Sequence, residues 1–300
     1  MKYIYIIVAT IILATSCTTK TGIRMIELKN QQIGVSSAHN ARQLGGYIIG
    51  DKQIKKDLLL RSAKLSSLSY EDSILLADKF RVQCIYDFRS AEEIQAAPDG
   101  IPGNSRHLSL SISFSDKRGN TDYIIESESQ MIQMLLENAE NPMIQAMCEK
   151  IYDKIFFEEA SQEVYRRFFA DLLTINPDNG AVLWHCTQGK DRAGCASAML
   201  LAALGADRKL IMADFELSKE YYDQMTVNIK TETESQRNVI NTLISANPIV
   251  FGKTLDKVDE KYGSFRNYLS ECIRLTPEMM KILQERYLCV KIVKKQLVNI

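Results

Sequence analysis

The sequence predicts an α/β fold, a parallel sheet of four to five strands flanked by helices, with a helical insert and a helical C-terminal part. Two observations predict it. Short apolar runs of strand length alternate along the chain with segments whose apolar residues recur at helical spacing. Polar residues suited to chemistry follow two of these runs directly, and in parallel sheets ligands bind outside the carboxyl ends of the strands.

The composition describes one large domain without a strong overall charge. The chain has 300 residues, 46% of them hydrophobic, and 37 lysines and arginines balance 37 aspartates and glutamates. A chain of this length can bury a substantial core. Because no basic block stands out, we expect no nucleic-acid partner.

The N-terminus has the features of an export signal. Lys2 precedes an apolar run at residues 3–13, which is shorter than the roughly 20 residues of a membrane-spanning helix. Small residues at 14–16 follow, as before a signal-peptide cleavage site. Cys17 then resembles the lipid-accepting cysteine of bacterial lipoproteins.

These features divide the chain into three parts. We expect a signal peptide at residues 1–16, a polar tether at 17–35 and the folded domain at 36–300. The protein would then be exported to the periplasm or outer envelope and held at the membrane by a lipid on Cys17. A secreted protein cut at the same site, without the lipid, is the alternative.

The first elements of the domain follow from turn and capping residues. Glycine-containing turns within residues 45–51 predict a short hairpin, and the leucines at 58–60 predict a buried strand. Ser69 and Asp72 form a capping pattern for a helix that ends near Phe80.

A second strand and helix repeat this pattern. Residues 82–88 predict a strand, and Ser90 with Glu93 predicts a capping box for the helix after it. Pro98 ends that helix, and residues 106–110 predict a third strand.

A long connection separates the third strand from the fourth, at residues 181–185. Methionine and aliphatic residues recur at helical spacing around residues 131–135 and 143–151, so the region of about 115–160 predicts an insert of at least two helices. A further helix is predicted around 164–172, and helices broken at two later prolines make up the C-terminal part.

The loop between the fourth strand and the next helix holds the densest group of polar residues. The apolar residues after Arg192 recur on one helical face, and Gly205 stands where a left-handed C-cap is expected. Cys186 therefore lies at a strand end under a helix N-terminus, where the unpaired amides and the helix dipole favour a thiolate. The same amides bind phosphate, and Arg192 adds a planar fork for two phosphate oxygens.

The form His-Cys-x-x-Gly-Lys-Asp-Arg resembles the loop of the bacterial atypical protein tyrosine or dual-specificity phosphatases. Further blocks resemble that family in order and type, and they lie at residues 40–47, 60–62, 87–90, 261–264 and 268–269. The resemblance implies the tyrosine phosphatase fold, and it implies that the helical insert acts as a lid. Ordinary packing of the insert is the alternative, because methionine stripes are usually core.

The resemblance also implies a mechanism without metal or cofactor. Cys186 attacks phosphorus, Arg192 and the loop hold the phosphate oxygens, and water hydrolyses the phosphocysteine. The remaining loop residues expected to bind substrate are Thr187, Gln188, Gly189, Lys190, Ala193 and Gly194. His185 would orient the loop from below.

Two carboxyls compete for the role of general acid. Asp191 lies within the loop and resembles the loop aspartate of the family, so it is the weakly preferred acid. Asp87 ends a neighbouring strand and is the alternative acid. It could equally form a structural salt bridge with Arg89 or Arg42, which are the expected supporting residues.

Two other loop positions affect the substrate and the rate. Lys190 supplies an extra cation, which suits substrates with several phosphates, although it could also be a solvated charge. Ala193 stands where the resembling family usually has Ser or Thr, whose hydroxyl donates to the nucleophilic sulfur. We therefore expect slow hydrolysis of the phosphocysteine, unless Thr187 or a water replaces that donor.

The function expected from this loop is hydrolysis of phosphotyrosine through a phosphocysteine. Phosphoserine, phosphothreonine or phosphoinositides are further possible substrates, so the partner is a phosphorylated protein or phospholipid. Two alternatives stay open, namely a catalytically weak phosphate-binding scaffold of the same fold and an inositol polyphosphate phosphatase. The second would need more basic residues than Lys190 alone.

Overall fold

The computed structural model describes residues 31–113 and 128–290. The expected export signal and Cys17 lie outside these residues. Among the helices of the described ranges, none has both the length and the apolar character that a membrane crossing requires.

Five strands form the central sheet, in the order β1-β4-β7-β5-β6. Their bounds are Arg42–Gln43 for β1, Leu59–Ser62 for β4, Val182–His185 for β7, Cys84–Asp87 for β5 and Arg106–Ser109 for β6. The last four strands in this order run parallel, and β1 pairs antiparallel with β4. The expected α/β fold is confirmed, and its fifth strand is the antiparallel one.

The strand register brings the carboxyl ends of three neighbouring strands to one edge. His185 of β7 pairs with Ser62 of β4 on one side and with Asp87 of β5 on the other. All four residues of β7 are buried, as expected for a central strand covered on both faces.

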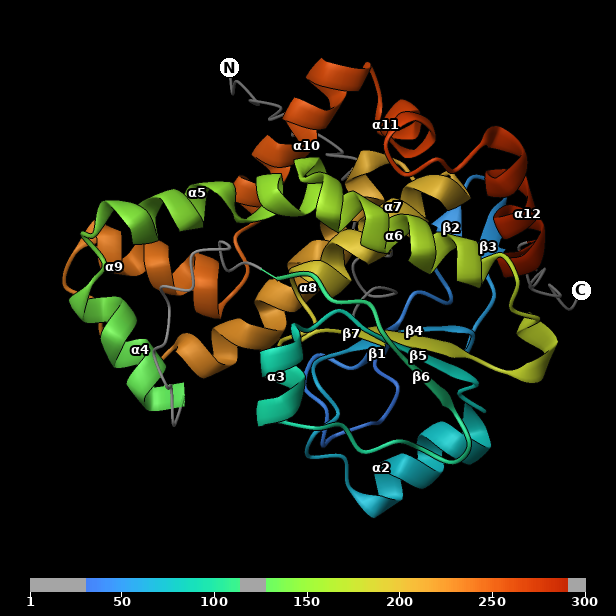
Figure 1. Ribbon diagram of the computed structural model, residues 1–300, viewed down its shortest axis with the longest axis horizontal. Helices are drawn as coiled ribbons and strands as arrows, with labels where there is room; N and C mark the ends of the chain where they lie inside the picture. Colours follow the sequence, from blue (N-terminus) through green and yellow to red (C-terminus); the bar gives the residue numbers. More distant parts are fainter. Residues whose placement is uncertain (1–30, 114–127, 291–300) are drawn as a thin grey trace, which may run out of the picture.

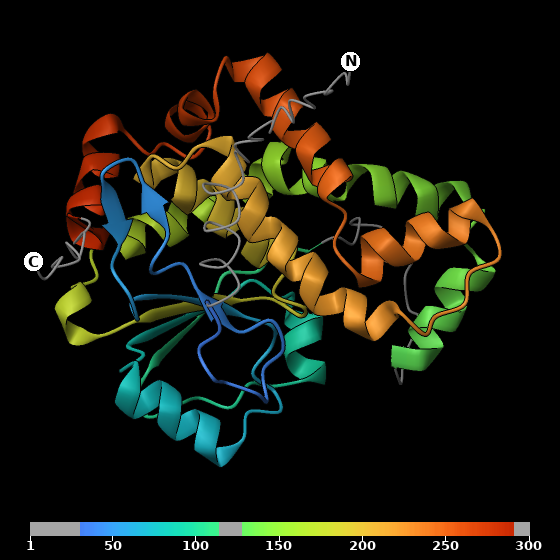
Figure 2. The same ribbon diagram turned by 180° about the vertical axis from the view of Figure 1, so that it is seen from behind.

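Helices cover both faces of the sheet (Figure 1). On one face lies α2 (Tyr70–Ile74), which continues into the π-helical turn η1 (Leu75–Lys79). The opposite side carries α5 (Pro142–Phe157), α6 (Glu159–Leu172), α7 (Arg192–Leu204), α8 (Arg208–Thr226), α10 (Pro248–Tyr262), α11 (Phe265–Glu271) and α12 (Pro277–Tyr287). The short helix α3 (Ala91–Ala96) lies at one end of the sheet in both views (Figures 1 and 2).

The helix starts that the sequence predicted agree with the structure. The Ser69 hydroxyl accepts the amide of Asp72, and Ser90 and Glu93 form the complete capping box at α3. Pro248 and Pro277, expected as helix breaks, are the first residues of α10 and α12, where a missing amide hydrogen is tolerated.

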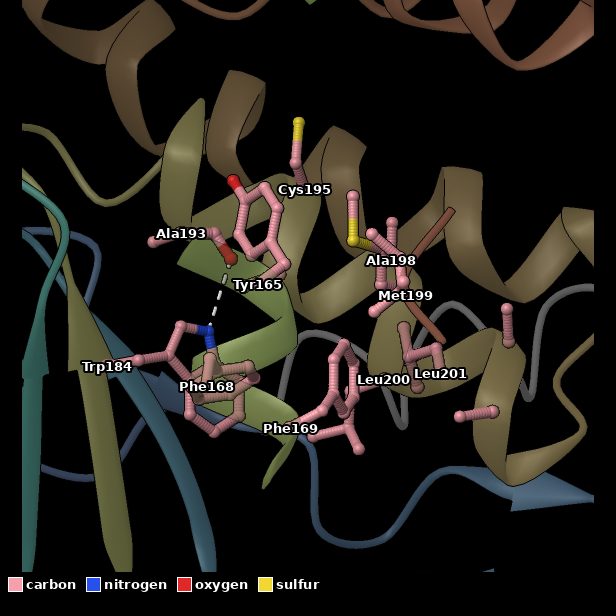
Figure 3. Close-up of a cluster of buried hydrophobic side chains, with 14 of the residues drawn as sticks. Tyr165, Phe168, Phe169, Trp184, Ala193, Cys195, Ala198, Met199, Leu200 and Leu201 are labelled. Carbon is pink, nitrogen blue, oxygen red and sulfur yellow. Dashed lines mark hydrogen bonds between the residues drawn. The ribbon is translucent and has the colours of Figure 1, made fainter. Parts of the chain in front are cut away.

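Helix α7 is the centre of the core. The sequence predicted one apolar face, but all of its residues are buried, because α5, α8, α11 and α12 pack around it as well as the sheet. Trp184 of β7 packs beneath its first turn, and the indole donates to the Ala193 carbonyl at 3.1 Å (Figure 3). Gly205 ends the helix with φ of 95°, as predicted.

Part of the insert forms a smaller apolar cluster beside the sheet. Helix α4 (Glu128–Glu137) and the first turns of α5 pack against α9 (Glu234–Val239) and the π-helical turn η3 (Ile240–Ile244). We call α4, α5, α9 and η3 the helical lobe. It extends from the same end of the sheet as α3 (Figures 1 and 2). The described part of the insert is therefore helical, and its action as a lid stays a prediction.

Two features differ from the predicted boundaries. The expected hairpin is present as β2 (Ile48–Ile49) and β3 (Lys52–Ile54), but it pairs with β8 (Leu288–Val290), which no strand pattern indicated. Residues 31–35, assigned to the tether, pack on the domain, because Ile33 and Val35 are buried in its second apolar cluster.

Candidate active site

Cys186 and Arg192 lie at the two ends of one loop on the carboxyl edge of the sheet. Cys186 directly follows β7, and Arg192 is the first residue of α7. The Cys186 side chain is buried among these elements. The strand, loop and helix predicted for this region are therefore present, with the thiol beneath the helix N-terminus.

Three consecutive carbonyls of the loop point away from its inside. The hydrogen bonds run from Lys64 N to Thr187 O (3.2 Å), from Tyr222 Oη to Gln188 O (2.5 Å) and from Arg61 Nη2 to Gly189 O (2.7 Å). In a trans peptide the N–H points opposite to its C=O. The amides that follow these carbonyls therefore face the inside of the loop, as a phosphate site requires.

Gly189 is required by the shape of the loop. Its φ is +65°, and an added Cβ would lie 2.2 Å from the carbonyl oxygen of Ser62. Only glycine adopts this conformation without strain and leaves room for the neighbouring strand end.

Arg192 is held by the carboxylate of Glu93. Glu93 Oε2 lies 2.6 Å from Nη1 of Arg192, and Oε1 lies 2.8 Å from Nη2. The Arg192 Nη1 group also donates to the Ile112 carbonyl at 3.0 Å, and Thr187 donates its hydroxyl to Glu93. The sequence indicated Glu93 only as a helix-capping residue, and that role gave no sign of this second contact.

Burial and charge act in opposite directions on Glu93. Burial opposes its ionisation, but the hydrogen bonds and charge of Arg192 outweigh burial and lower the pKa of Glu93 to about 2. The carboxylate is therefore ionised beside the phosphate-binding fork throughout the physiological range.

Asp87 forms a buried ion pair with Arg89. Its side chain is fully buried, and both of its oxygens accept from the Arg89 guanidinium, at 2.7 to 3.1 Å. Burial and this pairing support a structural salt bridge, and the alternative role of Asp87 as general acid stays a prediction. Of the two pairings left open, the structure has the one with Arg89.

Arg89 and His185 extend this buried network. Arg89 Nη2 lies 2.7 Å from Asp99 Oδ2, and His185 Nε2 lies 3.1 Å from the same oxygen. The ligand atoms of Asp87, Asp99, His107 and His185 lie within 4.8 Å of one another. The Arg89 guanidinium already supplies a cation to Asp87 and Asp99. We therefore interpret these four side chains as a structural support for the loop.

Arg42 pairs with Asp214 and not with Asp87, its expected partner. Its Nε donates to Asp214 Oδ1 at 3.2 Å, so it fastens β1 to α8. Arg61 of β4 reaches the same carboxylate through Nη1 at 2.5 Å and holds Gly189 with Nη2. Arg61 lies in one of the blocks that resemble the family but had no expected role, and no sequence pattern pointed to Asp214.

Lys190 does not face the inside of the loop. It is fully buried, and its amine donates to the carbonyls of Thr242 (2.9 Å) and Leu243 (3.1 Å) and to that of Ser245. The expected contact with substrate phosphates is therefore replaced by contacts with the last turn of η3. Burial lowers the pKa of the Lys190 amine.

Asp191 is the carboxyl that belongs to the loop itself. It is the N-cap residue of α7, and its Oδ1 accepts from the Tyr152 hydroxyl at 2.9 Å. Its Oδ2 lies 3.5 Å from the Lys190 amine. Ala193 and Gly194 follow in the first turn of α7 and are buried.

A cleft of about 590 Å³ opens beside the loop. Its lining includes Glu93, Met131, Thr187, Gln188, Tyr222 and Met225. It therefore lies between the loop, α3, α8 and the helical lobe.

The comparisons with known proteins match nearly the whole described chain. A tyrosine-protein phosphatase homologue of Cupriavidus necator is 24% identical over 242 residues, which are 79% of this chain and 82% of the relative. The triple specificity protein phosphatase PtpB of Mycobacterium tuberculosis is 26% identical over 240 residues, 71% of this chain and 84% of that protein.

Among solved structures, the core catalytic domain of the PP-IP phosphatase SIW14 from S. cerevisiae matches with a TM-score of 0.32 and 12% identity, over 78% of this chain and 97% of that domain. The profile of the tyrosine phosphatase family matches residues 33–289. That range contains the sheet, the loop and the helices around them, and the chain belongs to the tyrosine phosphatase family.

Proposed function

We propose that this phosphatase hydrolyses phosphotyrosine in proteins through a phosphocysteine intermediate. The observation that carries the proposal is the loop itself, in which Cys186 and Arg192 flank amides that face inward while the carbonyls are bonded outward. A nucleophile, an oxyanion site and a guanidinium fork are thereby brought together.

The reaction has two steps. The Cys186 thiolate attacks phosphorus, so that the S–P bond forms while the bond to the leaving oxygen breaks, and Asp191 donates its proton to that oxygen. Water then attacks phosphorus, the S–P bond breaks, and the water proton returns to Asp191. The products are orthophosphate and the free hydroxyl, and the thiolate is regenerated.

The walls of the cleft favour an aryl substrate. Met131, Met225 and Tyr222 line it, and such side chains pack well against an aromatic ring. Lys190, which suggested substrates with several phosphates, is bonded to η3 instead. A Lys190 cation facing the substrate was the reason to expect phosphoinositides or inositol polyphosphates, and this reason no longer applies.

The proposal is tested with Cys186→Ser on a phosphotyrosine peptide. Turnover is expected to be lost while binding of the intact phosphotyrosine peptide is retained, since the amides and Arg192 are unchanged. Rapid acid quench of the wild type should recover phosphate bound to Cys186. Turnover by the serine variant would contradict the role of Cys186. A wild type that shows neither turnover nor phosphocysteine would favour the phosphate-binding scaffold.

We also propose that the protein is exported and lipid-anchored at Cys17. The support is the sequence alone, namely Lys2, the apolar run at 3–13 and the small residues before Cys17. Cell fractionation should find the wild type in the envelope membrane and a Cys17→Ala variant in soluble periplasm. Wild-type protein in the cytoplasm with Met1 retained would contradict export.

A further inference from the structure

The carboxyl of Asp191 accepts a hydrogen bond from a tyrosine of the insert. The Tyr152 hydroxyl lies 2.9 Å from Asp191 Oδ1, and its side chain is fully buried on α5. Burial raises the pKa of Tyr152 well above its usual value, so the hydroxyl stays protonated and acts as the donor.

The ring of Tyr152 is fixed by two further aromatic rings. Phe215 of α8 and Phe251 of α10 contact it edge-on, with centroids 5.5 and 5.3 Å away. These two rings stack on each other at 4.1 Å. Three helices therefore determine where the hydroxyl points.

The second oxygen of Asp191 faces Lys190. The Lys190 amine lies 3.5 Å from Oδ2 and is anchored to the carbonyls of Thr242 and Leu243 in η3. Asp191 makes no side-chain cap bond to its own helix, although it occupies the N-cap position. The orientation of the carboxyl is thus set by α5 and η3 of the helical lobe, and not by α7.

We propose that Tyr152 is a positioning residue for the general acid. Its bond to Oδ1 fixes the rotation of the carboxyl that gives its proton to the leaving oxygen. The tyrosine proton itself is not transferred. This inference rests on the proposed function, in which Asp191 is the acid.

The test compares two substrates in a Tyr152→Phe variant. Phenyl phosphate needs a proton on its leaving oxygen, whereas p-nitrophenyl phosphate releases a stabilised phenolate and needs it much less. We expect kcat/KM, which reports the step that releases the leaving oxygen, to fall roughly tenfold for phenyl phosphate and less than about twofold for p-nitrophenyl phosphate. An equal fall for both substrates, or no fall, would overturn the inference.

Tyr165→Phe is the matched control. Tyr165 of α6 is equally buried, but its hydroxyl donates to the carbonyl of Arg192 at 2.9 Å and not to the acid. Any loss in this variant should be the same for both substrates. Selective loss of phenyl phosphate turnover here as well would mean that burial of a tyrosine, and not its bond to Asp191, causes the effect.

A double variant separates this inference from the proposed function. In an Asp191→Asn background, Tyr152→Phe should cause no further loss with phenyl phosphate, since the acid is already gone. Additive losses would overturn the positioning role while Cys186-dependent turnover remained. Turnover that survives Cys186→Ser would instead overturn the proposed function, and this inference with it.

Discussion

Glu93 and Arg192 form a two-point ion pair at the mouth of the loop, with Oε2 to Nη1 at 2.6 Å and Oε1 to Nη2 at 2.8 Å. The pair joins α3 to the start of α7. Glu93 Oε2 also accepts the Ser90 amide at 2.8 Å, so the helix cap and the guanidinium share one carboxylate. The position of the phosphate-binding fork therefore depends on the capping of α3.

Glu93→Ala should lower kcat/KM for aryl phosphates by roughly ten- to a hundredfold. A hydrogen bond to a charged group contributes about 1.5–3 kcal/mol, and without it the guanidinium is free to turn from its phosphate-binding orientation. Glu92→Ala, at the exposed neighbouring position in the first turn of α3, should change the rate little. Steady-state kinetics of both variants check this, and tighter phosphate binding by Glu93→Ala would show that the carboxylate only blocks the fork.

The same ion pair should be visible in the acid stability of the protein. The pKa of Glu93 is about 2 in the folded state against 4.5 for an unperturbed glutamate, so its contribution is present above about pH 4.5. It is lost as the pH falls through the folded value. The difference in unfolding free energy between wild type and Glu93→Gln, from urea titrations, should therefore shrink between pH 6 and pH 3. An unchanged difference would contradict the ion pair.

The loop was predictable from the sequence because its chemistry is local. Apolar periodicity predicts the strand and the helix, and the cysteine, glycine and arginine between them lie at a helix N-terminus, where anions bind. The partners of these residues are not local. Tyr152 lies 39 positions from Asp191, and Glu93 lies 99 positions from Arg192.

Lys190 illustrates why such contacts could not be predicted. Its place in the loop indicates a phosphate-binding cation, and only the packing of η3 against the loop turns the amine away. Asp87 illustrates the reverse case. Its salt bridge with Arg89, two positions away, was predicted as one of two pairings, whereas its complete burial depends on how β5 is covered.

Arg61→Met should destabilise the protein by about 3–5 kcal/mol, since it leaves the buried Asp214 carboxylate with one partner fewer and removes the donor to Gly189. Lys257→Met is the control. Its amine pairs with Asp153 at the surface, where a salt bridge contributes at most about 1 kcal/mol. Chemical denaturation gives the unfolding free energy of both variants. Equal losses would mean that the buried pair stabilises the protein no more than the surface pair does.

Gly189→Ala should abolish activity because the added Cβ would meet the Ser62 carbonyl at 2.2 Å. Gly50→Ala separates this clash from backbone strain. Gly50 has a similar φ of +62°, but nothing lies within 4 Å of its added Cβ. It should lose about 1–2 kcal/mol of stability and keep full activity. Thermal unfolding and phosphatase assays of both variants check this, and an active Gly189→Ala enzyme would contradict the role of the loop shape.

The last prediction concerns the second step of the proposed reaction. The resembling family usually has a hydroxyl at the position of Ala193 to donate to the departing sulfur. Thr187, the expected substitute, donates its hydroxyl to Glu93 instead. Phosphocysteine hydrolysis should therefore be slower than its formation, and mixing enzyme with p-nitrophenyl phosphate should release a burst of nitrophenol near one equivalent.

Ala193→Ser adds only one oxygen at this fully buried site, whose carbonyl stays bonded to Trp184 at 3.1 Å. A hydrogen bond to the leaving thiolate contributes about 1.5–3 kcal/mol, which is roughly ten- to a hundredfold on that barrier. The steady rate should therefore rise while the burst rate stays constant. Ala198→Ser, five residues further along α7, is the control for a buried hydroxyl and should leave both rates unchanged. If the wild type shows no burst and Ala193→Ser leaves the steady rate as it is, the missing hydroxyl does not limit turnover, and a water must donate to the sulfur.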